Sequence, residues 1–329
     1  MLRRHLEQHF NRVWYQHGRV PLFYRALARV YKTWVKPRCK RPTLTAPVPV
    51  IVVGNLTVGG GGKTPLVIAL ARHLSSAGYQ VAVISRGYGG RRRTLPYQVQ
   101  ANDTAAMVGD EPLLIAEQTG APVWVCSKRS EALAAAVKAG VKVVISDDGL
   151  QHLALPRTFE ICLLDGARGF GNGELLPAGP LRQPQDRLAD VDLVLVKGEG
   201  QVAGQAVRVD LLPERISQLD GSDSEPPDAW QGRAVHAVCG IANPAGFFRT
   251  LEALGMQIKP LAFPDHHPFK AEDFHGLAGA VVVTAKDAVK LRALGLDRSV
   301  HVLHVGMSLP AAVTTAVEKH LMEWSSAHE

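Results

Sequence analysis

The chain has 329 residues, of which 46% are hydrophobic and 20% charged, and both values are typical of a folded globular protein. This length suffices for one large or two ordinary domains. We expect no transmembrane helix, because no run of 18 apolar residues occurs, and no secretory signal, because the N-terminus lacks a compact apolar region with a small-residue cleavage site. The four cysteines lie far apart and offer no zinc site.

Positive charge is concentrated in the first 41 residues. The formal net charge is +7, yet residues 1–41 hold 11 Lys and Arg against one acid, Glu7. Residues 42–329 hold 26 basic and 29 acidic residues. The same first segment contains seven of the 20 aromatic residues. The chain therefore reads as a basic, aromatic N-terminal segment attached to a slightly acidic body.

The basic segment contains a predicted amphipathic helix that begins at Pro21. Four large apolar residues recur at helical spacing, and four basic residues fall on the opposite face: Phe23, Leu27, Val30 and Trp34, and Arg25, Arg29, Lys32 and Lys36. This pattern is typical of a helix at the surface of an anionic membrane. A helix packed on the core with a solvated basic back fits equally well. Nucleic acid is not expected as a partner, because no binding motif accompanies the charge.

From residue 50 onward, short hydrophobic strands alternate with helices. The pattern predicts strands at 50–53, 81–84, 123–125, 141–145, 160–164 and 192–196, and helices at 66–74, 111–118 and 130–139. Strands without alternation, separated by helices, favour a mostly parallel sheet that helices cover on both faces. The expected fold class is therefore α/β.

A second, smaller α/β unit is expected after a polar connection. Residues 213–233 are rich in Asp, Ser, Pro and Gly, which predicts an exposed loop. Strands at 234–239, 281–283 and 300–305 and helices at 243–255 and 287–294 then follow. We therefore expect three parts: membrane-associating helices over 1–41, a nucleotide-binding core over 42–205, and a smaller domain over 206–329.

A glycine-rich loop lies between the first predicted strand and the first predicted helix of the core. Its sequence is Thr57-Val58-Gly59-Gly60-Gly61-Gly62-Lys63-Thr64. In a P-loop, backbone N–H groups wrap the phosphates, the lysine reaches the terminal phosphates, and the hydroxyl binds Mg²⁺. The usual first glycine is replaced by Thr57. A glycine-rich turn without function is the alternative, which the strand–loop–helix context disfavours.

Two carboxylates follow a neighbouring hydrophobic strand. Asp147 and Asp148 come directly after residues 143–146, and Asp165 ends the next strand as a weaker candidate. P-loop enzymes need such an acid to position Mg²⁺, and doubly wound sheets bind ligands at the carboxyl ends of their strands. An Asp-Asp-Gly turn without function is the alternative. The residues thus predict a Mg²⁺-dependent nucleoside triphosphatase or kinase and leave its substrate open.

Several segments together resemble the tetraacyldisaccharide 4′-kinase family. They occur in that family's order between residues 50 and 290: Gly54–Gly60, Ser85–Gly89, Gly109–Pro112, Asp147–His152, Leu176–Arg182, Cys239–Pro244, Phe263–His267 and Lys286–Lys290. Each segment is weakly specific alone and the set is highly specific. The family also tolerates Ser or Thr at the position of Thr57.

The resemblance implies an activity, a location and a partner. It implies transfer of the ATP γ-phosphoryl group to the 4′-hydroxyl of a tetraacylated glucosamine disaccharide 1-phosphate, a step of lipid A biosynthesis. The cofactors would be ATP and Mg²⁺. The protein would be peripheral at the cytoplasmic face of the bacterial inner membrane, in contact with its anionic lipid surface. Two α/β domains would close around the nucleotide, and we expect a monomer.

The resemblance also suggests roles for single residues. Lys63 would neutralise transition-state charge, and Thr64, Asp147 and Asp148 would hold Mg²⁺. Asp110 resembles the family's catalytic acid and would pair with His266, so that the pair takes the proton of the sugar hydroxyl. From the residues alone, Asp110 could equally cap a helix, and His266 with His267 could be a surface pair.

A further set of polar residues could meet the acceptor. They are Arg86, Tyr88, Arg129, Gln151, His152 and Arg182. The arginines and Tyr88 could instead meet phosphates, Gln151 and His152 could instead touch the metal shell, and surface salt bridges are a further alternative for the arginines. Two positions depart from the family pattern, which usually has Glu at Gln183 and at Ala285. A metal or charge role at Gln183, and a salt bridge or hinge at Ala285, are therefore in doubt.

Two other classes of protein share part of this pattern. A P-loop GTPase-like switch should carry an Asn/Thr-Lys-x-Asp motif after a late strand. Residues 195–199 lack it, and Thr284-Ala285-Lys286-Asp287 matches it only superficially. A non-enzymatic membrane-binding module would not need Lys63 and Thr64 together with two acids.

Overall fold

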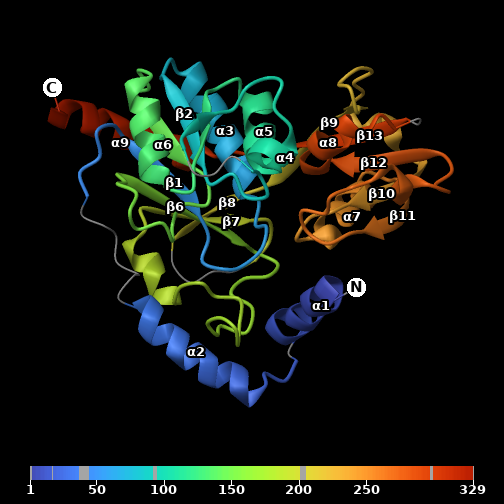
Figure 1. Ribbon diagram of the computed structural model, residues 1–329, viewed down its shortest axis with the longest axis horizontal. Helices are drawn as coiled ribbons and strands as arrows, with labels where there is room; N and C mark the ends of the chain where they lie inside the picture. Colours follow the sequence, from blue (N-terminus) through green and yellow to red (C-terminus); the bar gives the residue numbers. More distant parts are fainter. Residues whose placement is uncertain are drawn as a thin grey trace.

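The computed structural model describes residues 2–16, 18–36, 44–91, 95–200, 205–296 and 299–328. Within these ranges the chain builds two sheets with flanking helices, and the N-terminal helices lie apart from both (Figure 1). The predicted α/β class, with a large mostly parallel sheet and a smaller second unit, is confirmed.

The large sheet has eight strands in the order β3-β4-β2-β5-β1-β6-β7-β8. Every neighbouring pair is parallel except β3 with β4. The strands are β1 (Val50–Gly54), β2 (Val81–Ser85), β3 (Tyr97–Gln98), β4 (Val123–Val125), β5 (Val143–Ser146), β6 (Phe159–Asp165), β7 (Leu193–Lys197) and β8 (Ala206–Val209). Because the central strands are parallel, the ends of β1 and β5 meet at one edge of the sheet, where ligands bind in such folds.

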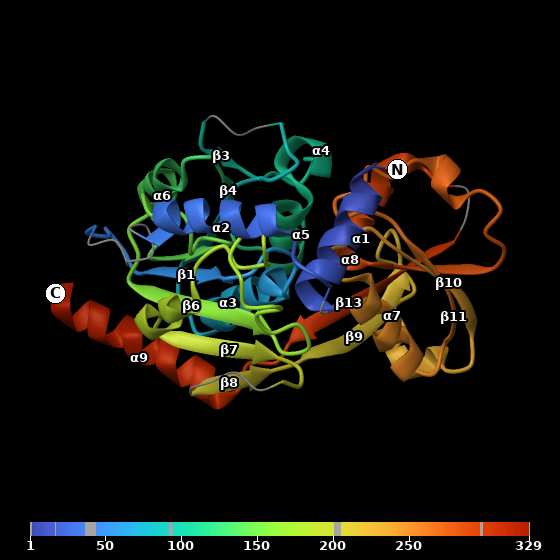
Figure 2. The ribbon, with the colours of Figure 1, turned by 90° about the horizontal axis from the view of Figure 1, so that it is seen from below.

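Helices cover both faces of this sheet (Figure 2). Side chains of α3 (Lys63–Ser76), α5 (Asp110–Thr119) and α9 (Ala311–His328) build the core on one face. Side chains of α6 (Arg129–Lys138) belong to the core on the other. All residues of β1 are buried, which explains why its sequence is continuously hydrophobic instead of alternating.

The small sheet has five strands in the order β11-β10-β12-β13-β9, and only β9 is antiparallel to its neighbour. The strands are β9 (Leu211–Gln218), β10 (Ala234–Cys239), β11 (Gln257–Ala262), β12 (Ala280–Thr284) and β13 (Val300–Met307). Its helices are α7 (Pro244–Ala253) and α8 (Ala285–Leu291), and α4 (Ala105–Val108) is a short helix of the large unit. Short 3-10 helices lie at Gln185–Asp190, Pro227–Trp230, Ala271–Phe274 and Arg292–Leu294.

The division between the two units differs from the expected one. Residues 206–209, placed in the smaller domain by the sequence, form β8 and pair with β7 in the large sheet. Helix α9 also returns to the core of the large unit, through Val313, Val317 and Leu321. The small unit is therefore connected to the large one at both ends, through β9 and β13.

The expected loop over 213–233 is wrong for its first residues. Residues 213–218 belong to β9, which pairs antiparallel with β13. The polar residues and Pro213 hid this strand, because an edge strand can keep one solvated face and tolerates proline.

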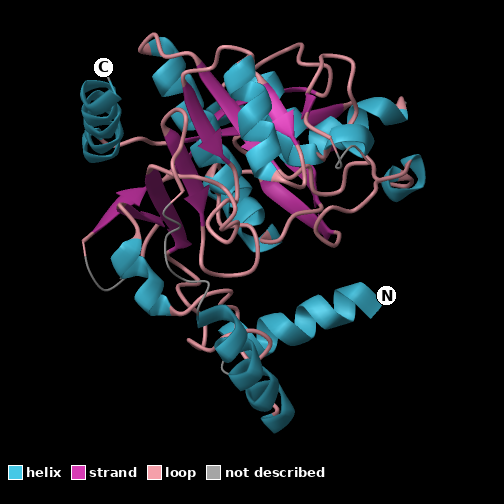
Figure 3. Ribbon diagram, turned by 60° about the vertical axis from the view of Figure 1, so that its left-hand side comes forward, coloured by secondary structure: helices cyan, strands magenta, loops and turns pink. Residues whose placement is uncertain are grey.

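The N-terminal helices α1 (Leu2–Tyr15) and α2 (Leu22–Val35) lie outside the sheet layers (Figure 3). The apolar stripe predicted on α2 is exposed, from 51% for Leu27 to 67% for Val30. A neighbouring face with Ala28 and Val35 is buried, and the hydroxyl of Tyr31 donates to the Arg182 carbonyl at 2.9 Å. The basic residues are exposed as well. Among the described helices, none has the length and apolarity needed to cross a bilayer.

Candidate active site

A cleft of about 1430 Å³ lies between the two units. The large unit contributes the glycine-rich loop, the residues after β5 and β6, and part of α5. The small unit contributes residues from the loops that follow β10, β11 and β12, and α1 contributes Phe10, Asn11, Trp14 and Tyr15. The cleft therefore collects the segments that the sequence singled out.

The glycine-rich loop joins β1 to α3 as predicted. Helix α3 begins at Lys63, and Gly62 precedes it with φ 94°, a conformation that glycine adopts without strain. The buried amide of Asn55 donates to the Gly59 carbonyl at 3.3 Å, which braces the loop from inside. Val58 to Thr64 line the cleft. Their N–H groups and the positive end of the helix dipole therefore face a space that could hold phosphates.

Thr57 lies behind this lining. It forms a bridge with Leu181, and its carbonyl accepts from Arg182 Nε at 3.1 Å. The next residue, Val58, donates its N–H to the Pro180 carbonyl at 2.8 Å. Residues 180–182 thus hold the start of the glycine-rich loop, which is called the phosphate loop below. Thr57 helps to position this loop and does not line the cleft.

Asp148 is held by two cations. Arg182 donates to its two oxygens at 3.2 and 3.1 Å, and Lys63 Nζ lies 3.5 Å from Oδ1. Burial alone would raise the pKa of Asp148, but Lys63 and Arg182 outweigh burial and lower it. Asp148 is therefore a carboxylate at neutral pH, and its charge fixes the Lys63 side chain at the mouth of the phosphate loop.

Asp147 sits in a different environment from its neighbour. It is only 2% exposed, and its Oδ1 has no hydrogen-bond partner among the described residues. Burial, together with the charges of Glu111 and Asp148, raises the pKa of Asp147 to about 7. A buried carboxylate oxygen without a partner beside phosphate-binding groups is what a hard cation such as Mg²⁺ would stabilise.

Asp147 and Asp148, with the nearby hydroxyl of Thr64, therefore offer a chemically suitable oxygen donor set. No cluster of three or more His, Cys, Asp or Glu side chains suited to a metal occurs in the described part of the chain. A Mg²⁺ ion here would need further oxygens from phosphates or water, as is usual for this ion.

The turn after the two acids is fastened to its surroundings. Arg129 donates to the carbonyls of Asp147 and Asp148 at 3.2 and 3.0 Å. Gln151 Nε2 donates to the Asn55 carbonyl at 2.9 Å and to Gln183 Oε1 at 3.1 Å. Gln183, where the family usually has Glu, therefore acts here as a neutral acceptor that orients Gln151.

A buried ion cluster supports the same turn from beneath. Arg157 donates to the carbonyls of Leu150 and Leu155 at 3.1 and 3.2 Å, and also to that of His152. Glu160 lies 2.9 Å from Arg157 and 2.6 Å from Arg187, and the side chains of all three residues are fully buried. Burial and nearby arginines lower the pKa of His152 to about 4, so its imidazole is neutral at pH 7.

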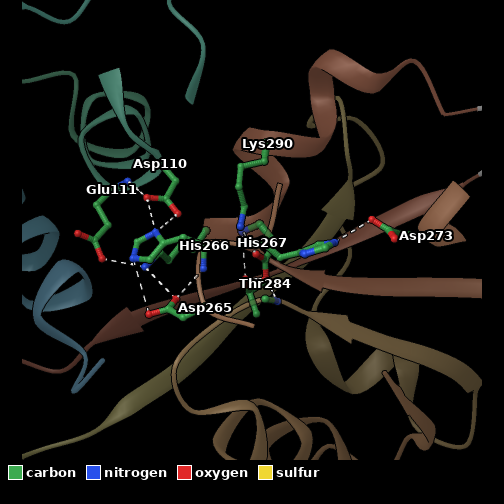
Figure 4. A network of polar contacts seen from close by, with 11 residues as sticks. Asp110, Glu111, Asp265, His266, His267, Asp273, Thr284 and Lys290 are labelled. Atoms are coloured by element: carbon green, nitrogen blue, oxygen red, sulfur yellow. Dashed lines mark hydrogen bonds and ion pairs between the residues drawn. The ribbon is translucent and has the colours of Figure 1, made fainter. Parts of the chain in front are cut away.

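Asp110 and His266 meet across the cleft (Figure 4). His266 Nδ1 lies 2.9 and 3.2 Å from the two oxygens of Asp110, and the Glu111 N–H donates to Asp110 at 2.9 Å. Burial alone would raise the pKa of Asp110, but the hydrogen bond with His266 and the charge of Lys286 lower it. Asp110 is the first residue of α5 and Gly109 is the N-cap, so the alternative of a capping residue does not hold.

A second layer of charges surrounds this pair. Lys286 Nζ lies 2.8 Å from Glu111 and 3.6 Å from Asp265. Burial alone would lower the pKa of Lys286, but these carboxylates raise it. A further ion pair joins Arg292 of the small unit to Glu117 of α5 at 2.5 Å. Ion pairs thus connect the two units along α5.

His267 and Ala285 take no part in this contact. His267 lies 2.9 Å from Asp273 within the small unit, so the two histidines are not a surface pair. Ala285 begins α8, whose N-cap Thr284 accepts from the Asp287 N–H at 3.1 Å. Asp287 in turn accepts from the Gly240 N–H at 3.0 Å, so this buried carboxylate braces the loop after β10.

The remaining predicted residues line the cleft in different ways. Tyr88 is 54% exposed, its ring centroid is 5.0 Å from that of His266, and Arg86 is exposed nearby. The sequence did not single out Asn55, Glu111 or Lys286. Each of the three lies within one of the segments that resemble the family, and this position in a motif was the available sequence signal for its role.

The chain resembles one family of known proteins. A family model described as tetraacyldisaccharide-1-P 4′-kinase matches residues 20–322. A tetraacyldisaccharide 4′-kinase of Legionella pneumophila (strain Lens) is 43% identical over 296 residues, which are 88% of this chain and 90% of the relative. One from Alkalilimnicola ehrlichii is 49% identical over 254 residues, covering 77% of this chain and 76% of the relative. The crystal structure of LpxK from Aquifex aeolicus in complex with ATP has a TM-score of 0.73 and 26% identity, covering 90% of this chain and 98% of that one.

Arg182→Gln is expected to lower the stability of the protein and loosen the phosphate loop. It leaves Asp148 without its paired donor and Thr57 without its brace. Because both side chains are partly exposed, the free energy of unfolding should fall by roughly 1–2 kcal/mol, which thermal melting can measure.

The matched control is Arg208→Gln, which removes an exposed arginine that pairs with Asp210 at 3.1 Å. Its melting temperature should change little. Equal melting temperatures for the two variants would show that Arg182 does not carry the structural role described.

Proposed function

The chain belongs to the tetraacyldisaccharide 4′-kinase family, and on this basis we propose how its cleft carries out the family's reaction. It is an ATP-dependent kinase of lipid A biosynthesis that phosphorylates the 4′-hydroxyl of tetraacyldisaccharide 1-phosphate. The contact between Asp110 and His266 carries the mechanism, because it puts a proton acceptor into the cleft that also contains the phosphate loop.

The phosphate loop positions the nucleotide. The N–H groups of Gly59 to Lys63 would surround the terminal phosphates, and Lys63 would neutralise charge on the transferred group. Phosphoryl transfer depends mainly on positioning and electrostatic stabilisation. The braces from Asn55 and Arg182 therefore matter, since they fix the loop before the nucleotide binds.

The proton of the acceptor hydroxyl would pass to His266. Asp110 accepts the Nδ1–H of the imidazole, which leaves the Nε2 lone pair for the substrate. Nε2 lies 3.6 Å from the Asp265 carboxylate, longer than a hydrogen bond, and His266 lines the cleft. Asp110 would orient the ring and stabilise the imidazolium that forms as the 4′-oxygen attacks the γ-phosphorus.

Closure of the two units assembles this site. Asp110 and Glu111 belong to the large unit, whereas His266 and Lys286 belong to the small one. The ion pair between Glu111 and Lys286 lies next to the dyad and would hold it in register. Proton transfer would therefore be possible only in the closed form, which limits loss of the phosphoryl group to water.

Mg²⁺ would be held by Thr64, Asp147 and Asp148. Oδ1 of buried Asp147 has no hydrogen-bond partner within the described ranges, which supports this assignment, and hard oxygen donors suit the ion. When bound, Mg²⁺ neutralises negative charge on the phosphates. It would also keep Asp147 ionised, which burial alone opposes.

We divide the six predicted substrate residues into two groups by their contacts and exposure. Arg129 and Arg182 donate to the chain around Asp148, and Gln151 to that around Asn55, so these three position the catalytic loops. Tyr88 and Arg86 are the more exposed members beside the dyad, and we assign them to the acceptor sugar. His152 lines the cleft, where it is half-buried and neutral, and we assign it to the acceptor as well.

Helix α2 would hold the protein, a monomer in this proposal, on the cytoplasmic face of the inner membrane. Its stripe of Phe23, Leu27, Val30 and Trp34 is exposed and would enter the lipid interface. The basic residues lie on the opposite side of the helix at 100° per residue. These basic residues would therefore lie about 10 Å from the lipid surface, which is the width of the helix and close to one Debye length. They would attract anionic lipid mainly by electrostatic attraction over this distance and less by direct contact.

Leu27→Asp is expected to weaken binding to vesicles that contain anionic phospholipid. Losing one buried leucine removes about 1.5–3 kcal/mol of transfer free energy, so the partition coefficient should fall at least tenfold. Vesicle flotation measures the bound fraction.

The control is Leu212→Asp, because Leu212 on β9 is 52% exposed and Leu27 is 51% exposed. Equal binding of the two variants would remove the membrane role of the α2 stripe.

The proposed mechanism is tested by ATP-dependent phosphorylation of tetraacyldisaccharide 1-phosphate. Lys63→Ala should bring transfer close to background, while its circular dichroism and melting curve stay near those of wild type. Tyr88→Phe should raise the KM of the acceptor more than it lowers kcat. Substantial turnover by folded Lys63→Ala would overturn the assignment of the phosphate loop.

A further inference from the structure

Arg168 lies where three parts of the molecule meet. It follows β6 in the loop over residues 166–173, is half-buried, and lines the cleft. No motif of the sequence singled it out, and the mechanism above does not use it.

Two contacts fix the position of its guanidinium. Nη2 donates to the Ala242 carbonyl at 3.3 Å, which belongs to the small unit. The guanidinium carbon also lies 5.1 Å from the ring centroid of Tyr15 at the end of α1, within the range of a cation–π interaction. Arg168 therefore touches both the closing unit and the N-terminal helices.

The same guanidinium points to the phosphate loop. A β-carbon placed on Gly59 would lie 3.7 Å from Arg168 Nη1. Gly59 is the first glycine of the run whose N–H groups would surround the terminal phosphates, and its φ of 108° suits glycine. One on Gly60 would lie 3.4 Å from the Ala242 side chain, so the small unit closes directly over this part of the loop.

Two other cations that line the cleft, Lys63 and Lys197, each lie close to a carboxylate. Lys63 lies 3.5 Å from Asp148, and Lys197 lies 2.7 Å from Asp165. Arg168, by contrast, forms no ion pair with a carboxylate among the described residues, and Nε and Nη1 take no part in a hydrogen bond there. A guanidinium with free donors at the rim of a phosphate-binding loop is suited to bind phosphate oxygens.

We propose that Arg168 binds the terminal phosphate of ATP and stabilises the charge that develops there during transfer. This inference rests on the proposed phosphate-binding role of Gly59 to Lys63. Arg168 is then an arginine supplied from within the chain, a role that other P-loop enzymes fill in cis or by a partner protein. Since Ala242 moves with the small unit, closure and placement of this charge occur together.

Tyr15 acts as a positioning residue in this arrangement. The end of α1 is packed closely on the Arg168 loop, because a β-carbon on Gly171 would lie 2.6 Å from the Trp14 carbonyl. The Trp14 indole also donates to the Pro177 carbonyl at 3.1 Å. A shift of α1 would therefore displace Arg168, so the N-terminal helices influence catalysis as well as location.

The test uses the full chain with Arg168→Ala and Arg168→Lys, and titrates each variant with ATP and with ADP. Arg168→Ala should weaken ATP binding, leave ADP binding nearly unchanged, and lower kcat by about 10²–10³-fold. Arg168→Lys should restore less than a tenth of the lost rate, because an ammonium cannot form the paired contacts of a guanidinium. Tyr15→Leu should lower kcat by roughly tenfold without changing ADP binding.

Arg208→Ala is the control for loss of an exposed arginine and should match wild type. Three results would overturn the proposal: an unchanged kcat in folded Arg168→Ala, an equal loss of ATP and ADP affinity, or a raised KM for the acceptor alone. The last would mean that Arg168 binds the phosphate of the acceptor. If wild type itself bound no ATP, the proposed function would fail, and this inference with it.

Discussion

The contact between Asp110 and His266 joins the two units inside the cleft. The proposed proton transfer depends on this contact. One residue begins α5 of the large unit, and the other follows β11 of the small unit, yet their side chains lie 2.9 Å apart. Neither unit alone contains both the phosphate loop and the complete dyad. The ion pairs of α5 with Lys286 and Arg292 flank this contact and also join the two units. The proposed chemistry therefore depends on a contact that only the packing of the two units provides.

Charged side chains around the glycine-rich loop are paired with one another or with backbone carbonyls. Asp148 is neutralised by Lys63 and Arg182, whereas Oδ1 of buried Asp147 has no hydrogen-bond partner in the described part of the chain. Beneath them, the ion pairs of Glu160 with two arginines hold the turn that carries Gln151. Removing one partner of such a buried ion pair lowers the stability of the protein strongly, because the remaining charge is left buried and unpaired. The buried charges of this protein thus hold loops in place. A site whose polar groups are held in place in this way favours electrostatic catalysis.

Local sequence signals predicted most of the large sheet and the phosphate loop, because hydrophobic strands and a glycine run are written in consecutive residues. The pairing of Asp110 with His266 needed the family resemblance, since 156 positions separate them. Strand β9 was missed because an edge strand can be polar, and β8 was assigned to the wrong unit because pairing partners leave no local trace. The supporting roles of Arg182, Arg157 and Arg168 arise from tertiary contacts with backbone carbonyls, which have no sequence pattern.

A double-mutant cycle tests whether Asp110 and His266 act together. The rate of phosphorylation of tetraacyldisaccharide 1-phosphate is measured for wild type, Asp110→Asn, His266→Gln and the double variant at saturating ATP. If the two side chains act as one unit, each single change should cost nearly the full loss and the double variant should cost little more. If the rate losses of the two single variants multiply in the double variant, Asp110 and His266 act independently and do not form a catalytic pair.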